Sequence, residues 1–337
     1  MRKKVADYLV FAALAAVGVM LILNQREVSE AVTESLKSCA YRIIPSLFAM
    51  TVISGAISKS GVVTRLIRFK RLDADILTAF IFGNIGGYPV GAKMLAETVD
   101  GGRISREEAE EAICFCYGCG PAFAAGVAGE AVFGRTEFGI AALLAVILSN
   151  ATMYAAYLIR HRSTSSKKAL QTSGFSTKLM TDSVNSAAGA MVGICAMIVF
   201  FSALKAILFA YFPRLSEVKY LAAILEISNI AGLSACKGVS LVTVALLLGF
   251  GGLCVIMQIF SVAGGSFGLT KFCVSRLIAL PLTAGYAFVI QRLLGRLGIE
   301  AAAAEKIRLS QSPSLIPVIC VAAMVFITLS ERRGVSR

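Results

Sequence analysis

The fold is decided by "FGNIGGYPVGAK", residues 82–93, a stretch that a helix crossing lipid would not ordinarily contain. Four glycines and a proline lie between Gly83 and Gly91, and Lys93 follows them. Non-helical backbone at membrane depth is tolerated only where protein or water satisfies its polar groups. We therefore expect a break at which two half-helices meet end to end near the membrane midplane, where their N–H groups form an anion site. In the alternative interpretation, the glycines serve only close helix packing.

The rest of the chain has the composition of an all-α, polytopic membrane protein. Of its 337 residues, 57% are hydrophobic and 16% are charged, and the mean hydropathy is +0.78. Soluble domains are typically about 45–50% apolar and about 25% charged. The net charge of +13 sits in short clusters between apolar runs, so we expect topology signals and no nucleic-acid partner. The first apolar run is expected to be an uncleaved helix.

The apolar runs predict about eight spanning helices and two shorter, interrupted segments. The interrupted segments, 76–93 and 220–236, are expected to be broken or re-entrant and to approach from opposite faces. With the N-terminus in the cytoplasm, cytoplasmic segments hold about twice as many Lys and Arg as outer ones, in line with the positive-inside rule; the basic segment 291–312 fits poorly. The runs predicted to span are 8–23, 39–59, 112–133, 138–159, 183–212, 239–262, 270–290 and 313–330.

The two halves of the chain resemble each other. "FIFGNIGG" in the first half corresponds to "LEISNIAG" in the second, and the turn Gly118–Gly120 corresponds to Gly249–Gly251. Paired, interrupted segments in an inverted repeat are typical of secondary transporters. The predicted parts are a first transmembrane helix (1–25), a first repeat (26–160), a basic cytoplasmic linker (161–180), a second repeat (181–297) and a C-terminal linker with the last helix (298–337).

Three longer motifs carry a resemblance to a known family. They are "RIIPSLFAMTVISGAISKSG" (42–61), "FGNIGGYPVGAKMLAETVDGGRISREEAEEAICFCYGCGPAFAAGVAGE" (82–130), and "LEISNIAGL" (225–233) with "LLLGFGGLCVIMQIFSV" (246–262). They resemble the YlbJ-type sporulation integral membrane proteins (stage V sporulation protein V), in the nucleoside-recognition or Gate group related to concentrative nucleoside transporters. The resemblance covers roughly 36–290 and implies transport of dipicolinic acid across the mother-cell membrane toward the forespore. "CYGCGPAF" and "NIAGL" depart from the family pattern, which bears on the solute contacts.

The expected solute site draws on residues at or near the breaks. Candidate cations at membrane depth are Lys93, Lys205 and Lys237. Lys93 is the first choice, with snorkelling to the headgroups as its alternative, whereas snorkelling or helix pairing is favoured for Lys205. The predicted substrate-binding residues are Asn84, Gly86, Gly87, Lys93, Gly120, Glu226 and Asn229.

The polar residues of this set could have structural roles instead of binding the solute. Asn84 and Asn229 occupy matching places in the two halves, and each could instead cap a helix or form an interhelical hydrogen bond. Glu226 lies three residues before Asn229 and so shares its helix face. It could take a coupling proton or sodium ion, or pair with a lysine.

No motif predicts catalysis or a cofactor. Cys114, Cys116 and Cys119 have a spacing seen in metal sites, but no fourth ligand lies nearby, so we expect no metal. The chain lacks H-E-x-x-H and a nucleophile–base pair, so we expect no enzyme. Ser105 and Glu108 predict a capping box. The expected partners are a small organic anion, dipicolinate by the resemblance, and the lipid bilayer of the cell membrane. A nucleoside-like solute, a membrane scaffold for spore assembly and a homo-oligomer stay open.

Overall fold

The computed structural model describes residues 2–62, 73–161, 176–235 and 238–296, and every regular element in them is a helix. The first half contains α1 (Arg2–Leu23), α2 (Gln25–Ser38), the π-helix η1 (Cys39–Ile43), α3 (Ile44–Ser60), α5 (Ala74–Ile85), α6 (Tyr88–Asp100), α7 (Arg106–Ala112), α8 (Pro121–Phe123), the π-helix η2 (Ala124–Glu130), α9 (Ala131–Phe133) and α10 (Thr136–Arg160). The second half contains α11 (Thr177–Tyr211), α12 (Pro213–Ser216), α13 (Leu221–Leu225), the 3-10 helix η3 (Ile227–Ala235), α14 (Leu241–Phe250), α15 (Gly252–Ala263) and α16 (Thr270–Arg296). The predicted all-α class is confirmed.

Fewer helices than predicted are long and apolar enough to cross a membrane. Among the described residues there are four, α10, α11, α14 with α15, and α16, or five if α1 and α2 count as one bent span. The predicted eight are therefore not confirmed. Two features of the structure reduce the number of spans. The predicted span 112–133 is interrupted over 113–120, and α1 meets the helix that follows it at a bend of 90°. The predicted run 313–330 lies outside the described residues.

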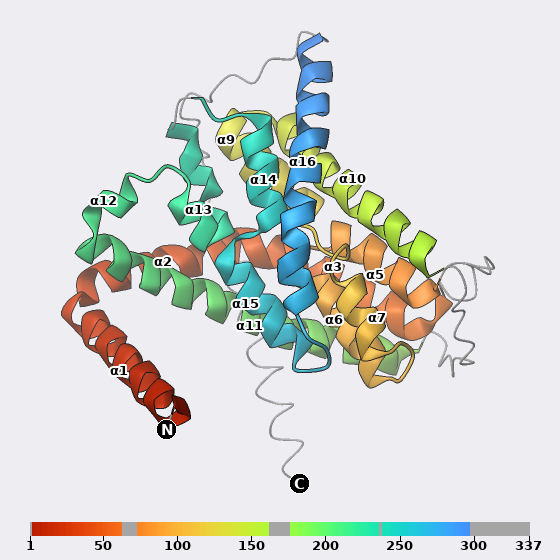
Figure 1. The fold of residues 1–337 in the computed structure, drawn as a ribbon, viewed down its shortest axis with the longest axis horizontal. Helices are drawn as coiled ribbons and strands as arrows, with labels where there is room; N and C mark the ends of the chain where they lie inside the picture. The colour runs from red at the N-terminus through yellow and green to blue at the C-terminus, as the bar shows by residue number, and fades with distance from the viewer. Residues whose placement is uncertain (1, 63–72, 162–175, 236–237, 297–337) are drawn as a thin grey trace.

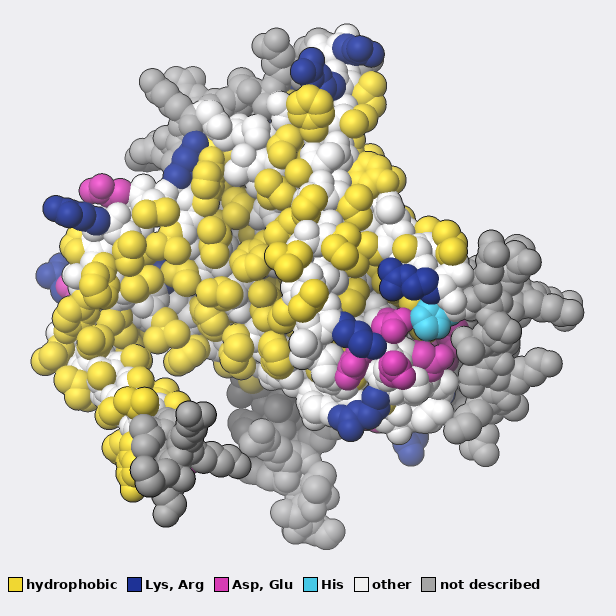
Figure 2. Space-filling model, viewed as in Figure 1, with side chains coloured by type: hydrophobic (Ala, Val, Ile, Leu, Met, Phe, Trp, Pro, Cys, Tyr) yellow, Lys and Arg dark blue, Asp and Glu magenta, His cyan; other side chains and the backbone are white. Residues whose placement is uncertain are grey.

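The surface fits a multi-pass membrane protein. Hydrophobic side chains cover most of the face shown in Figure 2, while charged side chains gather at its edges and around the single histidine. Along α16, Leu277 is 75% exposed and Ile278 is 62% exposed. Water would disfavour so wide an apolar surface, whereas lipid would cover it without penalty.

The helices cross between the two halves of the chain. α11 packs along α2 and α3, α16 packs on α10 and α14, and α6 packs on both α5 and α15. In Figure 1, α16 crosses the front of the molecule and α1 extends away from the other helices. Contacts between α6 and α15 bring the predicted repeats together at the centre of the fold, where the predicted interruptions lie.

The first interruption is real, but its geometry differs from the prediction. Instead of meeting end to end, α5 and α6 fold back and pack side by side. A Cβ atom built on Gly83 would lie 3.1 Å from the Gly91 Cα atom, and either glycine would then also crowd the Cys116 carbonyl group. Small residues allow helices to approach this closely. The same glycines therefore produce the break and the close packing that the sequence suggested as alternatives.

A capping box fixes the start of α7, as predicted. The Ser105 hydroxyl accepts from the Glu108 backbone N–H (3.2 Å), and the Glu108 carboxylate accepts from the Ser105 backbone N–H (2.8 Å). Nearby, Arg103 pairs with Asp75 of α5 at 2.8 Å. This loop therefore ties the start of α5 to the segment that leads into the second interruption.

We expect Gly91→Ala to destabilise the protein, because its methyl group would overlap the Cys116 carbonyl oxygen. Overpacking of this kind typically costs about 1–3 kcal/mol. Thermal unfolding of the detergent-solubilised protein should show a lower midpoint. Gly285→Ala is the matched control, because no atom lies within 4 Å of a Cβ there. Equal midpoints for the two variants would contradict the close packing of α5 on α6.

Candidate functional site

The first break lies at Gly86 and Gly87, between α5 and α6. The Gly86 N–H donates to the Phe82 carbonyl oxygen at 2.7 Å, which completes α5. Gly87 has a φ of 103°, a backbone conformation that side chains other than glycine's rarely adopt. Pro89 follows in the first turn of α6, where its missing N–H leaves no intrahelical bond unmade. The local sequence therefore ends one helix and starts the next within two residues.

The second break, over 113–120, packs directly on the first. Gly120 has a φ of 76°, and a Cβ atom there would lie 3.3 Å from the Gly87 amide nitrogen. A Cβ atom on Gly118 would lie 2.8 Å from the Asn84 carbonyl oxygen. Glycine is required at this backbone approach. The region predicted as the spanning run 112–133 is thus a second broken segment.

Two further breaks lie in the second half of the chain and pack against the first two. Between α13 and η3, Glu226 is extended, with φ −148° and ψ 117°. Between α14 and α15, Gly251 and Gly252 have φ values of 80° and 86°. A Cβ atom on Gly252 would lie 3.2 Å from the Ile227 amide nitrogen, and one on Gly251 would overlap the Tyr117 hydroxyl group. The four breaks, two from each half of the chain, therefore pack against one another.

Two tyrosines from the first half of the chain donate hydrogen bonds to backbone carbonyl groups at the end of α14. The Tyr88 hydroxyl donates to the Leu248 carbonyl oxygen at 2.9 Å, and the Tyr117 hydroxyl donates to the Phe250 carbonyl oxygen at 2.7 Å. The last carbonyl groups of a helix have no intrahelical partner, and the hydrocarbon region supplies no water to replace one. The tyrosines thus stabilise the Gly251–Gly252 break and join the repeats.

Arg276 of α16 also donates hydrogen bonds to backbone carbonyl groups beside the breaks. It was not among the residues predicted from the sequence. Its side chain is buried, donates to the carbonyl oxygens of Gly249 (3.4 Å) and Cys114, and lies over the Tyr117 ring at 5.0 Å. These carbonyls flank the second and fourth breaks. The available signal was an arginine within the apolar run 270–290, because intramembrane cations usually have a specific partner or role.

Asn84 and Asn229 do not share a cavity. Asn84 is 2% exposed, and its side-chain amide donates to the carbonyl oxygens of Phe80 (2.8 Å) and Phe115 (3.0 Å). Its side-chain oxygen accepts from Asn150 of α10 at 2.7 Å. Asn84 therefore forms the interhelical hydrogen bonds that were its alternative interpretation, and Asn229 lies elsewhere.

A small cavity, here called the central cavity, lies where the four breaks meet. Its volume is about 30 Å³, room for about one water molecule. This conformation is therefore closed to a larger solute. Each break, or the helical turn after it, contributes to the lining. The lining residues are Ile43, Leu47, Tyr88, Pro89, Cys119, Phe123, Ile194, Ile198, Glu226, Ile227, Val255 and Gln258.

Glu226 is the acidic group of the central cavity. It is 3% exposed, and its carboxylate accepts from the Ser228 backbone N–H and from the Asn229 side-chain amide, each at 2.9 Å. The Asn229 side-chain oxygen accepts from the Lys205 ammonium group. The structure thus brings together two of the predicted residues, Glu226 and Asn229, and connects them to Lys205 through an amide.

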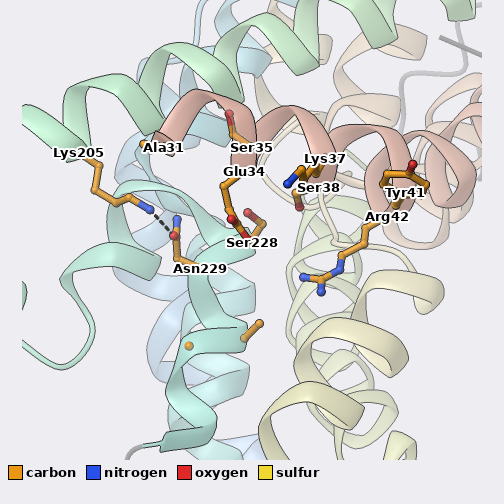
Figure 3. Close-up of a pocket in the computed structure, with 12 residues that line it drawn as sticks. Ala31, Glu34, Ser35, Lys37, Ser38, Tyr41, Arg42, Lys205, Ser228 and Asn229 are labelled. Atoms are coloured by element: carbon orange, nitrogen blue, oxygen red, sulfur yellow. Dashed lines mark hydrogen bonds between the residues drawn. The ribbon is translucent and has the colours of Figure 1, made fainter. Parts of the chain in front are cut away.

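Two larger cavities flank the central one. The first, here called the basic cavity, has a volume of about 560 Å³ and is lined by Lys205, Asn229, α2 and η1 (Figure 3). The second, here called the lysine cavity, has a volume of about 370 Å³ and is lined in part by Lys93. It shares Ile194 and Gln258 with the central cavity. The central cavity therefore adjoins the lysine cavity directly and the basic cavity through the hydrogen bonds of Glu226.

α11 runs past all three cavities. Ser186 lines the lysine cavity, Ile194 and Ile198 line the central cavity, and Lys205 lines the basic cavity. At about 1.5 Å per residue, the distance from Ser186 to Lys205 along the helix is about 28 Å. A bilayer's hydrocarbon core is about 30 Å thick. The three cavities are therefore arranged in series over a distance comparable with the membrane.

Lys93 lies in an ion-pair cluster at the lysine cavity. Its ammonium group is 3.2 Å from the Glu97 carboxylate and donates to the Ser186 hydroxyl. Lys59 of α3 lies 3.4 Å from the same Glu97 oxygen. These contacts join α3, α6 and α11, so Lys93 holds protein helices together in this conformation. Lys237, the third candidate cation, lies outside the described residues.

The cysteines that suggested metal spacing are buried free thiols near the second break. Cys114, Cys116 and Cys119 are all buried. In the part of the chain that the structure describes, no group of three or more His, Cys, Asp or Glu is arranged to hold a metal ion.

Comparisons with protein-family models, curated proteins and solved structures found no match for this chain. The features of the molecule that bear on its function are the geometry of the four breaks, the cavities beside them and the charged side chains that line these cavities.

Proposed function

We propose that the protein is a membrane transporter whose solute crosses through the central cavity. The observation that carries this proposal is the convergence of four backbone breaks, two from each half, on one cavity that contains a buried carboxylate. Broken helices that meet within the membrane are typical of transporter binding sites. The flanking cavities would then be the two access routes, and the closed central cavity would open as one repeat rocks against the other.

The solute we favour is a small organic anion, with dipicolinate as the first to test. Lys205 provides positive charge at the basic cavity, and Lys93, which is paired with Glu97 in this conformation, lines the cavity at the other end of the route. The motif resemblance to sporulation membrane proteins points to the same solute and to export from the mother cell toward the forespore. No catalytic residue and no cofactor is part of the proposal.

A nucleoside-like solute is the second candidate, and the central cavity itself favours it. Glu226, Tyr88 and Gln258 offer acceptors and donors without a basic side chain in the lining. An ionised carboxylate beside an anionic solute would be repelled strongly in a poorly solvated site. If the solute is an anion, Glu226 must therefore be protonated while it passes, which makes the proton a co-transported ion.

Lys93→Gln should abolish uptake of labelled pyridine-2,6-dicarboxylate into proteoliposomes, and Lys93→Arg should retain part of it. The physical reason is that glutamine removes the charge that faces the lysine cavity, whereas arginine keeps it. Lys178→Gln is the matched control, since Lys178 is exposed near the start of α11. Uptake of uridine is measured beside that of the anion. Full anion uptake by Lys93→Gln, at equal protein per vesicle, would leave Lys93 a purely structural role.

Glu226→Gln should remove the pH dependence of anion uptake. In the parent protein we expect uptake to rise as the pH is lowered within the near-neutral range, because Glu226 must bind a proton for the anion to pass. The solute itself stays ionised there, since carboxylic acids ordinarily titrate near pH 4. The other titratable groups that interact with Glu226 are Lys205, Tyr88, Cys39 and Cys254. A parent and a Glu226→Gln variant with the same pH profile would contradict proton coupling at this residue.

A further inference from the structure

The basic cavity is an open pocket built from four elements of the chain, in which Lys37 and Arg42 are exposed and Lys205 is half-buried. It has a volume of about 560 Å³ and is lined by Ala31, Glu34, Ser35, Lys37, Ser38, Tyr41, Arg42, Lys205, Ser228, Asn229, Ala231 and Gly232. Small-molecule sites typically have volumes of about 300–1,000 Å³. In Figure 3, Lys205 and Asn229 lie at one end, Lys37 and Arg42 lie at the other, and Glu34 lies between them.

The charges of this cavity are not balanced. Three basic side chains, Lys37, Arg42 and Lys205, line it together with one carboxylate, Glu34. Among the described residues, none of the three basic groups has a carboxylate within salt-bridge distance. Lys205 donates only to an amide oxygen, that of Asn229. A pocket in which one sign of charge is in excess concentrates ions of the opposite sign.

Within the described residues, the basic side chains of the lysine cavity, unlike those of the basic cavity, are paired with carboxylates. There, Lys93 and Lys59 both pair with Glu97, and Asp100 also lines the wall. The positive charges of the lysine cavity are thus neutralised by protein carboxylates. Among the described residues, the lysines and the arginine of the basic cavity form no ion pair with a carboxylate, although Glu226 and Glu34 lie near enough to interact electrostatically with Lys205. An anion from outside the chain would supply the ion-pair partner.

The excess of positive charge indicates how many acidic groups such an anion carries. Three basic side chains and one carboxylate leave two positive charges unbalanced in the lining, which matches the charge of a dianion. Lys205 and Arg42 lie at opposite ends of the cavity (Figure 3). Arginine suits one acidic group of the dianion, because its guanidinium binds carboxylate or phosphate in two parallel hydrogen bonds. The hydroxyl groups of Ser35, Ser38 and Tyr41 add neutral donors.

We propose that the basic cavity is a binding site for a small organic dianion, held between Lys205 and the Arg42–Lys37 pair, at one end of the solute route. The inference rests on the proposed function for its place in transport and goes beyond it in assigning a second site, separate from the central cavity. Through Asn229, the dianion at Lys205 contacts the same hydrogen-bond network that holds Glu226. The basic cavity would therefore hold the solute immediately before or after it passes the central cavity.

The test is direct binding to the full-length protein in detergent, measured by calorimetry without any transport. The probes are pyridine-2,6-dicarboxylate, the monoanion pyridine-2-carboxylate, the neutral pyridine-2,6-dicarboxamide and inorganic phosphate. We expect saturable binding of the dicarboxylate, weaker binding of the monoanion and none of the diamide. Lys205→Gln and Arg42→Gln should each weaken dicarboxylate binding by about tenfold or more, as loss of one partner in a charge-assisted contact does.

Three controls keep the result interpretable. Arg214→Gln removes a charge from exposed α12 outside the cavity lining and should bind like the parent. Lys205→Arg keeps the charge and should bind within a few-fold of the parent, which separates loss of charge from misfolding. Nanodiscs of phosphatidylglycerol test the lipid phosphate as the source of the anion, and the proposal predicts that they do not compete with the dicarboxylate.

Unchanged affinity in Lys205→Gln and Arg42→Gln, equal binding of the diamide, or occupation by phosphatidylglycerol alone would each overturn the site. The outcome is independent of the transport proposal. If the expected binding pattern holds but proteoliposomes show no uptake, the site stands and the transport function fails. If uptake occurs while both variants bind like the parent, transport stands and this site fails.

Discussion

The structure depends on one constraint: backbone that leaves the helical conformation within a membrane must find its hydrogen-bond partners inside the protein. Four segments break in this chain, and they meet that constraint by packing on one another. Glycine makes the contacts feasible, since a Cβ atom on Gly120 would press on Gly87 and one on Gly252 would press on Ile227. The Tyr117 hydroxyl group, which a Cβ atom on Gly251 would overlap, joins the two halves of the chain, so the breaks form one unit and not four local defects.

Side chains complete what the backbone leaves unsatisfied. Tyr88 and Tyr117 reach from the first repeat to carbonyl groups at the end of α14, and Arg276 bonds to carbonyl groups beside two of the breaks. A buried arginine held by carbonyl groups and aromatic rings brings positive charge next to helix C-termini, where the dipole favours it. These three side chains therefore stabilise the breaks, while Glu226 and Lys205 are the charged groups to which the transport proposal assigns contact with the solute.

Local sequence signals predicted some of this structure well. The Gly86–Gly87 break and the Ser105–Glu108 capping box are set by residues within a few positions of each other, and both occur. The all-α class followed from composition. A turn was predicted at Gly118–Gly120, but the run 112–133 around it was still predicted to span, because most of its residues are apolar; the structure is non-helical over 113–120.

Contacts between distant residues could not be predicted in the same way. Asn84 and Asn229 occupy matching positions in the sequence, yet Asn84 bonds to Asn150 on α10 and Asn229 bonds to Lys205 on α11. Nothing local specifies those partners, because packing of whole helices brings them together. The basic cavity illustrates the same limit, since its charges come from α2, η1 and α11. Lys205, for which snorkelling or helix pairing was favoured, shares one cavity with Lys37 and Arg42 only in the folded chain.

The central claim is that solute passes the point where the four breaks meet, and Gln258 offers the most direct test. Gln258 lines both the central and the lysine cavities, so a cysteine there is open to a small thiol reagent that enters from the lysine cavity. The measurement is uptake by a Gln258→Cys variant, in a transporting background without native cysteines, after treatment with a membrane-permeant thiol reagent. The account predicts that the reagent blocks uptake, that solute slows the reaction, and that Ile278→Cys on the exposed face of α16 shows neither effect. Modification of Cys at 258 with unchanged uptake, and with no protection by solute, would contradict it.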